Sequence, residues 1–276
     1  MKKAVSISLL IAIILVLFGG CTKKDTPPSL PPANSMTIDF SNFLASQKSA
    51  GIDVLATKTN WTAAVTTAGF WNLLLTINLI VPVASFKKAM DNTPVYLDNK
   101  KWEWKYSVNL IGATYNARLT GQIQTSDIKW EMYISKTGVD PYSEFMWFSG
   151  TSALDGKSGQ WILNHSQTYK EPMLQIDWTV TGTDVGSIKY TYVRDKTDNR
   201  TTDWFKNSYI EYGLTSGTLN AKYTVHHNIS TTTSDFKDVY IEWSTANHNG
   251  HIKALHYFQD SNWHCWDGTG NDVTCN

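Results

Sequence analysis

The stretch KWEWKYSVNL, residues 101–110, decides the fold of this chain. Its apolar residues alternate strictly with polar ones. Successive side chains of a strand point to opposite faces, so this stretch predicts a strand with one dry face and one wet face. The same alternation returns in four later runs, at 115–123, 128–134, 174–180 and 219–225. Short polar or glycine-containing breaks separate the runs, which together predict an antiparallel β-meander of about eleven strands.

A long apolar segment precedes the strands. Asn60 can cap a helix over about 61–90 that is interrupted near Pro82. Apolar residues lie almost all round this helix, and a helix of that kind is buried either in a protein core or in a membrane. Polar residues along it, among them Asn72, favour burial in the core. Residues 36–50, nearer the N-terminus, are compatible with a strand or with a short helix.

The width of the sheet constrains how the helix and the strands pack. Eleven strands spaced about 4.8 Å apart would make a flat sheet about 48 Å wide, and one helix about 10 Å across cannot cover it. We therefore expect a mainly β (α+β) fold, a long antiparallel β-meander curled as a half-barrel or barrel around one buried N-terminal helix. This shape resembles the half-barrel of periplasmic lipoprotein carriers and related lipid-binding proteins, and the resemblance implies an apolar ligand.

The first 21 residues have the pattern of an export signal. Lys2 and Lys3 are followed by an apolar run over 4–18, which is short for a membrane span. The residues Leu17-Phe18-Gly19-Gly20-Cys21 resemble the lipobox of bacterial lipoproteins, although that family usually has Leu or Val in place of Phe18. The resemblance implies a signal peptide over 1–20 and a Cys21 that is diacylated as the mature N-terminus. The alternative is an ordinary secretory signal, which also exports the protein.

The segment that follows predicts where the protein works. Residues 21–35 are rich in proline and have almost nothing to bury, so we expect a solvated tether there and a single β-rich domain over 36–276. Thr22 follows the cysteine, which in lipoproteins of the enterobacterial type implies passage to the outer membrane. We expect a lipid-anchored protein of the bacterial cell envelope, facing either the periplasm or the surface.

Charge and cysteine content agree with export. The chain has 24 basic and 24 acidic residues, and two lysines leave with the signal, so no basic field exists to hold nucleic acid. If Cys21 is acylated, Cys265 and Cys275 remain as an even pair, which predicts a disulfide in an oxidising compartment. The loop is short, so the bond should contribute about 2–3 kcal/mol. The alternative, a reactive thiol pair, lacks the C-x-x-C spacing.

The residues that carry chemistry give no catalytic signature. There is no G-x-S-x-G elbow, no H-E-x-x-H motif and no glycine-rich dinucleotide turn. Of the late histidines, only His227 and His256 fall on the expected inner face, where hydrogen-bonded polar residues are more common than metal ligands. The loop over 267–272 is interpreted as a glycine-rich turn and not as a calcium site. We expect no cofactor, no metal and no catalytic role, with a hydrolase as the alternative.

Twelve tryptophans are the strongest remaining clue to function. Most occupy inward positions, where core packing is the default explanation. If a cavity is left between helix and sheet, it would accept an acyl chain, and we expect its lining to include Trp102, Trp104, Tyr106, Trp130, Trp178, His227 and His256. The expected function is therefore a non-catalytic envelope lipoprotein that binds an apolar or lipid ligand.

A glycan-binding surface lipoprotein is the alternative function. Sugar rings stack on exposed aromatic side chains, and three tryptophans in irregular context, Trp204, Trp263 and Trp266, are candidates for such a platform. The many aromatics with Asn and Thr resemble the composition of lipoproteins of the Bacteroidota, in which glycan capture is common.

Overall fold

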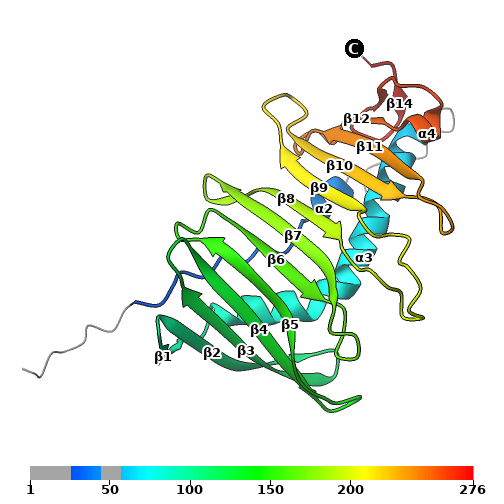
Figure 1. The fold of residues 1–276 in the computed structure, drawn as a ribbon. Helices are drawn as coiled ribbons and strands as arrows, with labels where there is room; N and C mark the ends of the chain where they lie inside the picture. The colour runs from blue at the N-terminus through cyan, green and yellow to red at the C-terminus, as the bar shows by residue number, and fades with distance from the viewer. Residues whose placement is uncertain (1–25, 45–56, 276) are drawn as a thin grey trace, which may run out of the picture.

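The computed structural model describes residues 26–44 and 57–275, so the expected signal peptide and Cys21 lie outside the described residues. Within these ranges, fourteen strands form one antiparallel sheet in which every strand pairs with the next one along the chain (Figure 1). The first and last strands do not pair with each other, so the sheet is an open, curled meander and not a closed barrel. The expected mainly β fold class is confirmed.

The bounds of the elements follow the expected pattern closely. The helices are α2 (Ser41–Leu44), α3 (Thr59–Ala89) and α4 (Leu255–Phe258). The strands are β1 (Val95–Asp98), β2 (Lys101–Leu110), β3 (Ala113–Ile123), β4 (Asp127–Thr137), β5 (Tyr142–Ala153), β6 (Ser158–Asn164), β7 (Pro172–Thr181), β8 (Asp184–Tyr192), β9 (Tyr209–Leu214), β10 (Ala221–Asn228), β11 (Phe236–Trp243), β12 (Gly250–Lys253), β13 (His264–Trp266) and β14 (Asp272–Val273). The count exceeds the expected eleven because β1, β13 and β14 have only two to four residues, too few to show alternation in the sequence.

Tryptophan and glycine alternate across the face of the sheet that packs on α3, which we call the inner face. In one row, Trp102 of β2 pairs with Gly121 of β3, which pairs with Trp130 of β4. Trp130 pairs in turn with Gly150 of β5, and Gly150 with Trp161 of β6. A Cβ atom added to Gly121 would lie 2.5 Å from the Trp130 ring. The glycines thus leave the space that the neighbouring indole rings fill.

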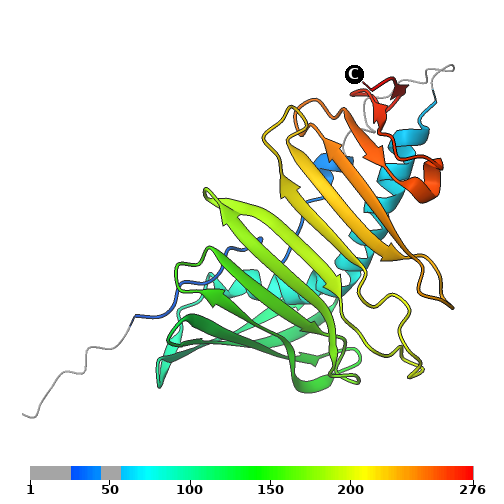
Figure 2. The ribbon, with the colours of Figure 1, turned by 45° about the horizontal axis from the view of Figure 1, so that its top comes forward.

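Helix α3 lies along the inner face and contacts β12–β14 near its start and β2–β3 near its end (Figure 1). It is continuous through Pro82, whereas the sequence predicted an interruption there. Proline removes one backbone donor and bends a helix without necessarily ending it, and α3 changes direction in its second half (Figure 2). The expectation of a fully buried helix is wrong for one face, because Leu73 and Ile77 are exposed.

The start of α3 is held by the C-terminal loop and not by the expected N-cap. Asn60 lies inside the helix. The Asp272 carboxylate accepts hydrogen bonds from the backbone N–H groups of Thr59 and Asn60, at 3.0 and 2.9 Å. The predicted disulfide is confirmed: Cys265 and Cys275 are bonded, with their Cα atoms 5.3 Å apart. The disulfide closes the loop that carries Asp272, so the C-terminal loop and the start of α3 meet at this point.

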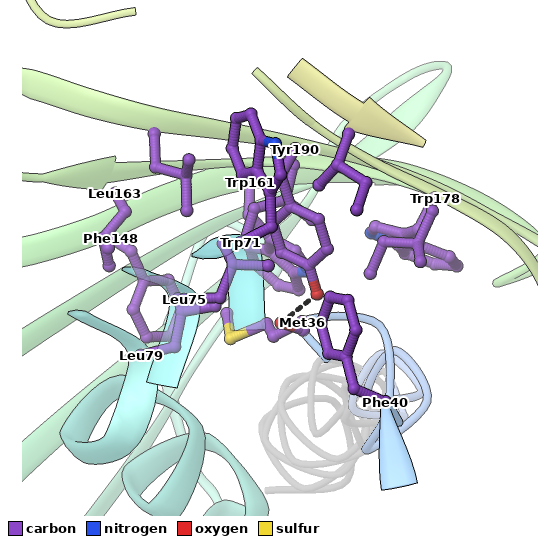
Figure 3. Packing of buried hydrophobic residues seen from close by; sticks show 14 of the residues in the cluster. Met36, Phe40, Trp71, Leu75, Leu79, Phe148, Trp161, Leu163, Trp178 and Tyr190 are labelled. Atoms are coloured by element: carbon purple, nitrogen blue, oxygen red, sulfur yellow. Dashed lines mark hydrogen bonds between the residues drawn. The ribbon is translucent and has the colours of Figure 1, made fainter. Parts of the chain in front are cut away.

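The N-terminal segment packs on the same face of the sheet as α3. Pro28 and Pro31 are buried, so the expected solvated tether is wrong from Pro28 onward. The Trp161 Nε1 donates to the Ser35 Oγ at 3.2 Å, and the Tyr190 hydroxyl donates to the Met36 carbonyl oxygen at 2.8 Å (Figure 3). The sequence did not indicate this packing, because a proline-rich composition shows only how the isolated segment behaves. It does not show that the rest of the domain offers a surface on which the segment can pack.

Candidate functional site

A groove of about 320 Å³ lies between α3 and residues 37–40, beside Tyr190 of β8. Its volume is at the lower end of the range typical of small-molecule sites, about 300–1,000 Å³. The residues that line it come from the N-terminal segment, from one side of α3 and from β8: Thr37, Ile38, Phe40, Asn72, Leu75, Thr76, Leu79, Ile80, Val83, Ala84, Lys87 and Tyr190.

The groove has a rigid floor. Leu75 and Leu79 are buried against the sheet, and the ring of Phe40 stacks on that of Tyr223 with the centroids 5.4 Å apart. Figure 3 shows Phe40 and Leu75 on the two sides of the Tyr190 hydroxyl, which points to the Met36 carbonyl, and Leu79 farther away beside Phe148. Burial raises the pKa of Tyr190 well above its ordinary value, so the phenol stays neutral and remains a donor. The N-terminal segment is therefore fixed beside the helix.

The lining combines apolar side chains with a single cation. Among the described residues that line the groove, Lys87 is the only charged one, and it is exposed near the end of α3. Asn72, Thr37 and Thr76 add neutral polar groups. An apolar channel with one positive charge at its margin is suited to a molecule with an apolar chain and an anionic head.

The tryptophans that the sequence predicted to bind a ligand do not line this groove. Trp102, Trp104, Trp130 and Trp178 are at most 2% exposed and belong to the packed core. The rings of Trp104 and Trp130 lie 5.9 Å apart. The expected cavity between helix and sheet is filled at these positions, because indole rings on the strands are long enough to reach the helix.

Tyr106, the fifth residue of that nominated set, also serves the core. Its hydroxyl donates to the Ser85 carbonyl oxygen of α3 at 2.7 Å. Burial raises the pKa of Tyr106 well above its ordinary value. This side chain ties the end of α3 to β2 and lies outside the groove.

The two nominated histidines lie close together but away from the groove. The ring centroids of His227 and His256 are 6.3 Å apart. The sequence predicted that both would lie on the inner face of the sheet, but His256 belongs to the short helix α4. Burial lowers the pKa of both rings, and the positive charge that His256 can carry lowers that of His227 further. Within residues 26–44 and 57–275, no group of three or more His, Cys, Asp or Glu side chains could hold a metal ion.

The aromatics nominated for a glycan platform are dispersed. Trp266 is 1% exposed, and Trp263 is half-buried with its ring stacked 3.8 Å from that of His251. Trp204 is 37% exposed. A second depression of about 450 Å³, lined mostly by polar side chains, crosses β4–β9. There the Asp177 carboxylate accepts hydrogen bonds from Gln160 and Gln175, at 2.6 and 2.7 Å.

Two signals in the sequence could have indicated the groove. Ile38 and Phe40 flank Asp39 in a short alternation, which is typical of an extended segment with one dry side. On α3, the lining positions from 72 to 87 recur every three or four residues, as the positions on one side of a helix do. Neither signal stood out, because the helix is apolar on nearly every side and the N-terminal segment is short.

Comparison with known proteins adds no relative. We found no protein-family model, no curated protein and no solved structure that matches the chain. Among the described residues, α3 alone is long and apolar enough to cross a membrane by length and composition. One such helix is weak evidence for a membrane span, since core helices pass the same test.

Proposed function

We propose that this protein is a non-catalytic, lipid-anchored lipoprotein of a bacterial envelope that binds one acyl chain of an anionic amphiphile. The observation that carries the proposal is the groove beside α3, which is mainly apolar and has Lys87 as the charged residue of its lining. The acyl chain of the ligand would lie between Phe40 and Leu79, and its anionic head group would face Lys87.

Burial of the chain provides the affinity. Each buried methylene contributes about 0.8 kcal/mol, so eight of them give roughly 6 kcal/mol before the cost of immobilisation is subtracted. A carboxylate paired with the exposed Lys87 would add only about 0.2–1 kcal/mol. The groove should therefore select for chain length more strongly than for the head group.

The anchor is supported by residues outside the groove. The sequence around Cys21 resembles a lipobox, and the bonded pair Cys265–Cys275 is typical of an oxidising compartment such as the periplasm. We propose the outer membrane as the site of the anchor, because Thr22 and not an aspartate follows Cys21. We do not extend the proposal to glycan capture, because the nominated aromatics form no common platform.

Native mass spectrometry of the protein extracted from its host membrane tests the groove. Wild type should carry one amphiphile in addition to the covalent lipid. Thr76→Phe should lose that mass, because Thr76 lines the groove and a phenyl ring would occupy it. Thr66→Phe is the matched control: the same change on an exposed residue of the same helix, outside the lining, should leave the mass in place.

If no ligand co-purifies, palmitate is added to each purified protein and its binding is measured by the same mass spectrometry. Wild type and Thr66→Phe should then bind one palmitate, and Thr76→Phe should bind at least tenfold more weakly. Lys87→Met should weaken the binding of palmitate by about two- to fivefold. It should leave the binding of the corresponding alcohol unchanged. Equal binding by Thr76→Phe and wild type, or no binding by wild type, would reject the groove as the site.

Metabolic labelling tests the anchor separately. Cells grown with an alkyne analogue of palmitate should incorporate the label into wild type, because the lipobox cysteine receives acyl chains. Cys21→Ser should carry no label, and Cys275→Ser should still carry it, since only the first change removes the acylated thiol. A labelled Cys21→Ser protein would show that the assignment is wrong.

A further inference from the structure

Helix α3 presents an apolar ridge to solvent, formed by Phe70, Leu73, Ile77 and Ile80. These side chains are 45%, 61%, 66% and 42% exposed, respectively. Their spacing of three, four and three residues places them in one line along the helix. The opposite side of α3, which includes Trp71, is buried against the sheet. The ridge is therefore a second apolar face that the described residues, 26–44 and 57–275, leave exposed.

The ridge continues beyond the helix. The Phe70 ring lies 5.5 Å from that of Phe205, and the Phe205 ring lies 5.3 Å from that of Trp204. Trp204 is 37% exposed. Trp204 thus extends the apolar surface past the start of the ridge, with an indole N–H that prefers a partly wet environment.

Charge distinguishes this side of the molecule from the other. Residues 59–89 contain no Asp or Glu, and Lys87 and Lys88 are exposed at the end of α3. The outer face of the sheet carries ion pairs instead, among them Arg118–Glu144 at 2.7 Å and Lys129–Glu131 at 2.8 Å. An apolar helix face with lysines at its margin is typical of helices that lie in the membrane interface.

We infer that this ridge, together with Trp204, lies in the interfacial layer of the membrane that holds the anchor. The inference rests on the proposed acylation of Cys21. Thr26, the first described residue, follows Cys21 by five residues, a span of at most about 17 Å along an extended chain. The lipid therefore holds Thr26 close to the membrane surface.

The N-terminal segment determines which side of the domain faces the membrane. It runs on the same side of the sheet as α3 (Figures 1 and 2) and is fixed there by the bonds from Trp161 to Ser35 and from Tyr190 to Met36. The anchor consequently keeps the ridge near the bilayer at a high effective concentration. The groove opens on this side as well, since Ile80 belongs to both surfaces.

A second copy of the chain fits the ridge less well. A stable dimer buries about 800 Å² on each partner. Aromatic side chains bury about 150–250 Å² each, and leucine and isoleucine bury less. The four ridge residues and Trp204, each exposed by about half, therefore supply roughly half of that area. A bilayer needs no matching partner surface, which favours it as the occupant.

Depth-dependent quenching tests the inference on the full lipidated chain in vesicles of phosphatidylethanolamine and phosphatidylglycerol that carry a nitroxide on a lipid tail. Cys21 is acylated and the other two cysteines are bonded, so Leu73→Cys provides one thiol for a fluorophore. Thr151→Cys on the outer face of β5 is the control. The label at 73 should be quenched several-fold more than the label at 151. Ile77→Asp, added to Leu73→Cys, should reduce that quenching while the protein still floats with the vesicles.

The outcomes separate this inference from the proposed anchor. Flotation with equal quenching at both positions would overturn the membrane-facing ridge and leave the anchor intact. An emission change at 73 that depends on protein concentration would indicate a dimer and would also overturn it. Failure to float would reject the anchor, and the ridge assignment with it.

Discussion

Gly150→Ala is expected to lower the free energy of unfolding by about 2–3 kcal/mol, through overpacking alone. Gly150 of β5 lies between Trp130 and Trp161 in the inner-face row. A Cβ atom built on it would lie 2.5 Å from the Trp161 ring and would also overlap the Gln160 carbonyl oxygen. One of these obstacles is backbone, so a change of rotamer cannot relieve the clash. Chemical denaturation followed by circular dichroism measures the loss.

Gly69→Ala is the matched control for this prediction. Gly69 lies in α3, and an added Cβ would meet no atom within 4 Å. Alanine is favoured over glycine in a helix by about 0.5–1 kcal/mol, so this variant should be more stable than wild type. Gly121→Ala should fall between the two, because its Cβ would meet only the Trp130 side chain. A Gly150→Ala protein as stable as wild type would show that the row has room to adjust.

The strands could be predicted from the sequence because each of them carries its own information. In β2, Trp102 and Trp104 alternate with Glu103 and Lys105, and the structure buries both tryptophans. Because every strand buries one face against the same helix, its inward residues can be predicted without knowing which strand lies beside it. The curl of the sheet also followed from width alone, because one helix cannot cover a flat sheet of that size.

The bounds of α3 lie close to the expected 61–90, but the contacts that hold the helix could not be predicted in the same way. The group that satisfies the first N–H groups of α3 is Asp272, more than 200 residues away, and no local pattern around Asn60 reveals it. Pro82 was interpreted as a stop because proline usually ends a helix, yet packing of the flanking turns outweighs the lost bond here. At both positions, the start of α3 and Pro82, tertiary contacts determine the structure of the helix.

The candidate site was misplaced for a related reason. Large aromatic residues on the strands indicated where apolar surface is, but not whether something fills it. Trp161 of β6 meets Phe86 of α3 with the ring centroids 5.2 Å apart, so the interior is closed at that point. The open surface lies at the flank of α3, where Ile38 and Phe40 meet the helix, and there the sequence shows only a short alternation.

Removal of the C-terminal disulfide is the second prediction with a large effect. Cys265→Ser combined with Cys275→Ser should lower the free energy of unfolding by about 2–3 kcal/mol, the contribution expected for a loop of this length. The loss is not confined to the C-terminus. The Lys58 Nζ donates to the Thr269 carbonyl oxygen at 3.0 Å, and the Asn60 Nδ2 donates to the Cys265 carbonyl oxygen at 2.9 Å. Opening the loop should therefore also fray the first turn of α3.

A double-mutant cycle with Asp272→Ala shows whether the disulfide acts through the helix. With the disulfide intact, Asp272→Ala should cost about 1–2 kcal/mol, because it leaves two N–H groups of α3 without an acceptor. With the disulfide removed, the same change should cost clearly less, since the loop no longer holds the carboxylate in place. Asp184→Ala, at an exposed position at the start of β8, is the control and should change stability by less than about 0.5 kcal/mol. Additive losses, measured by chemical denaturation, would mean that the disulfide constrains the C-terminus alone and that the helix start is held independently of it.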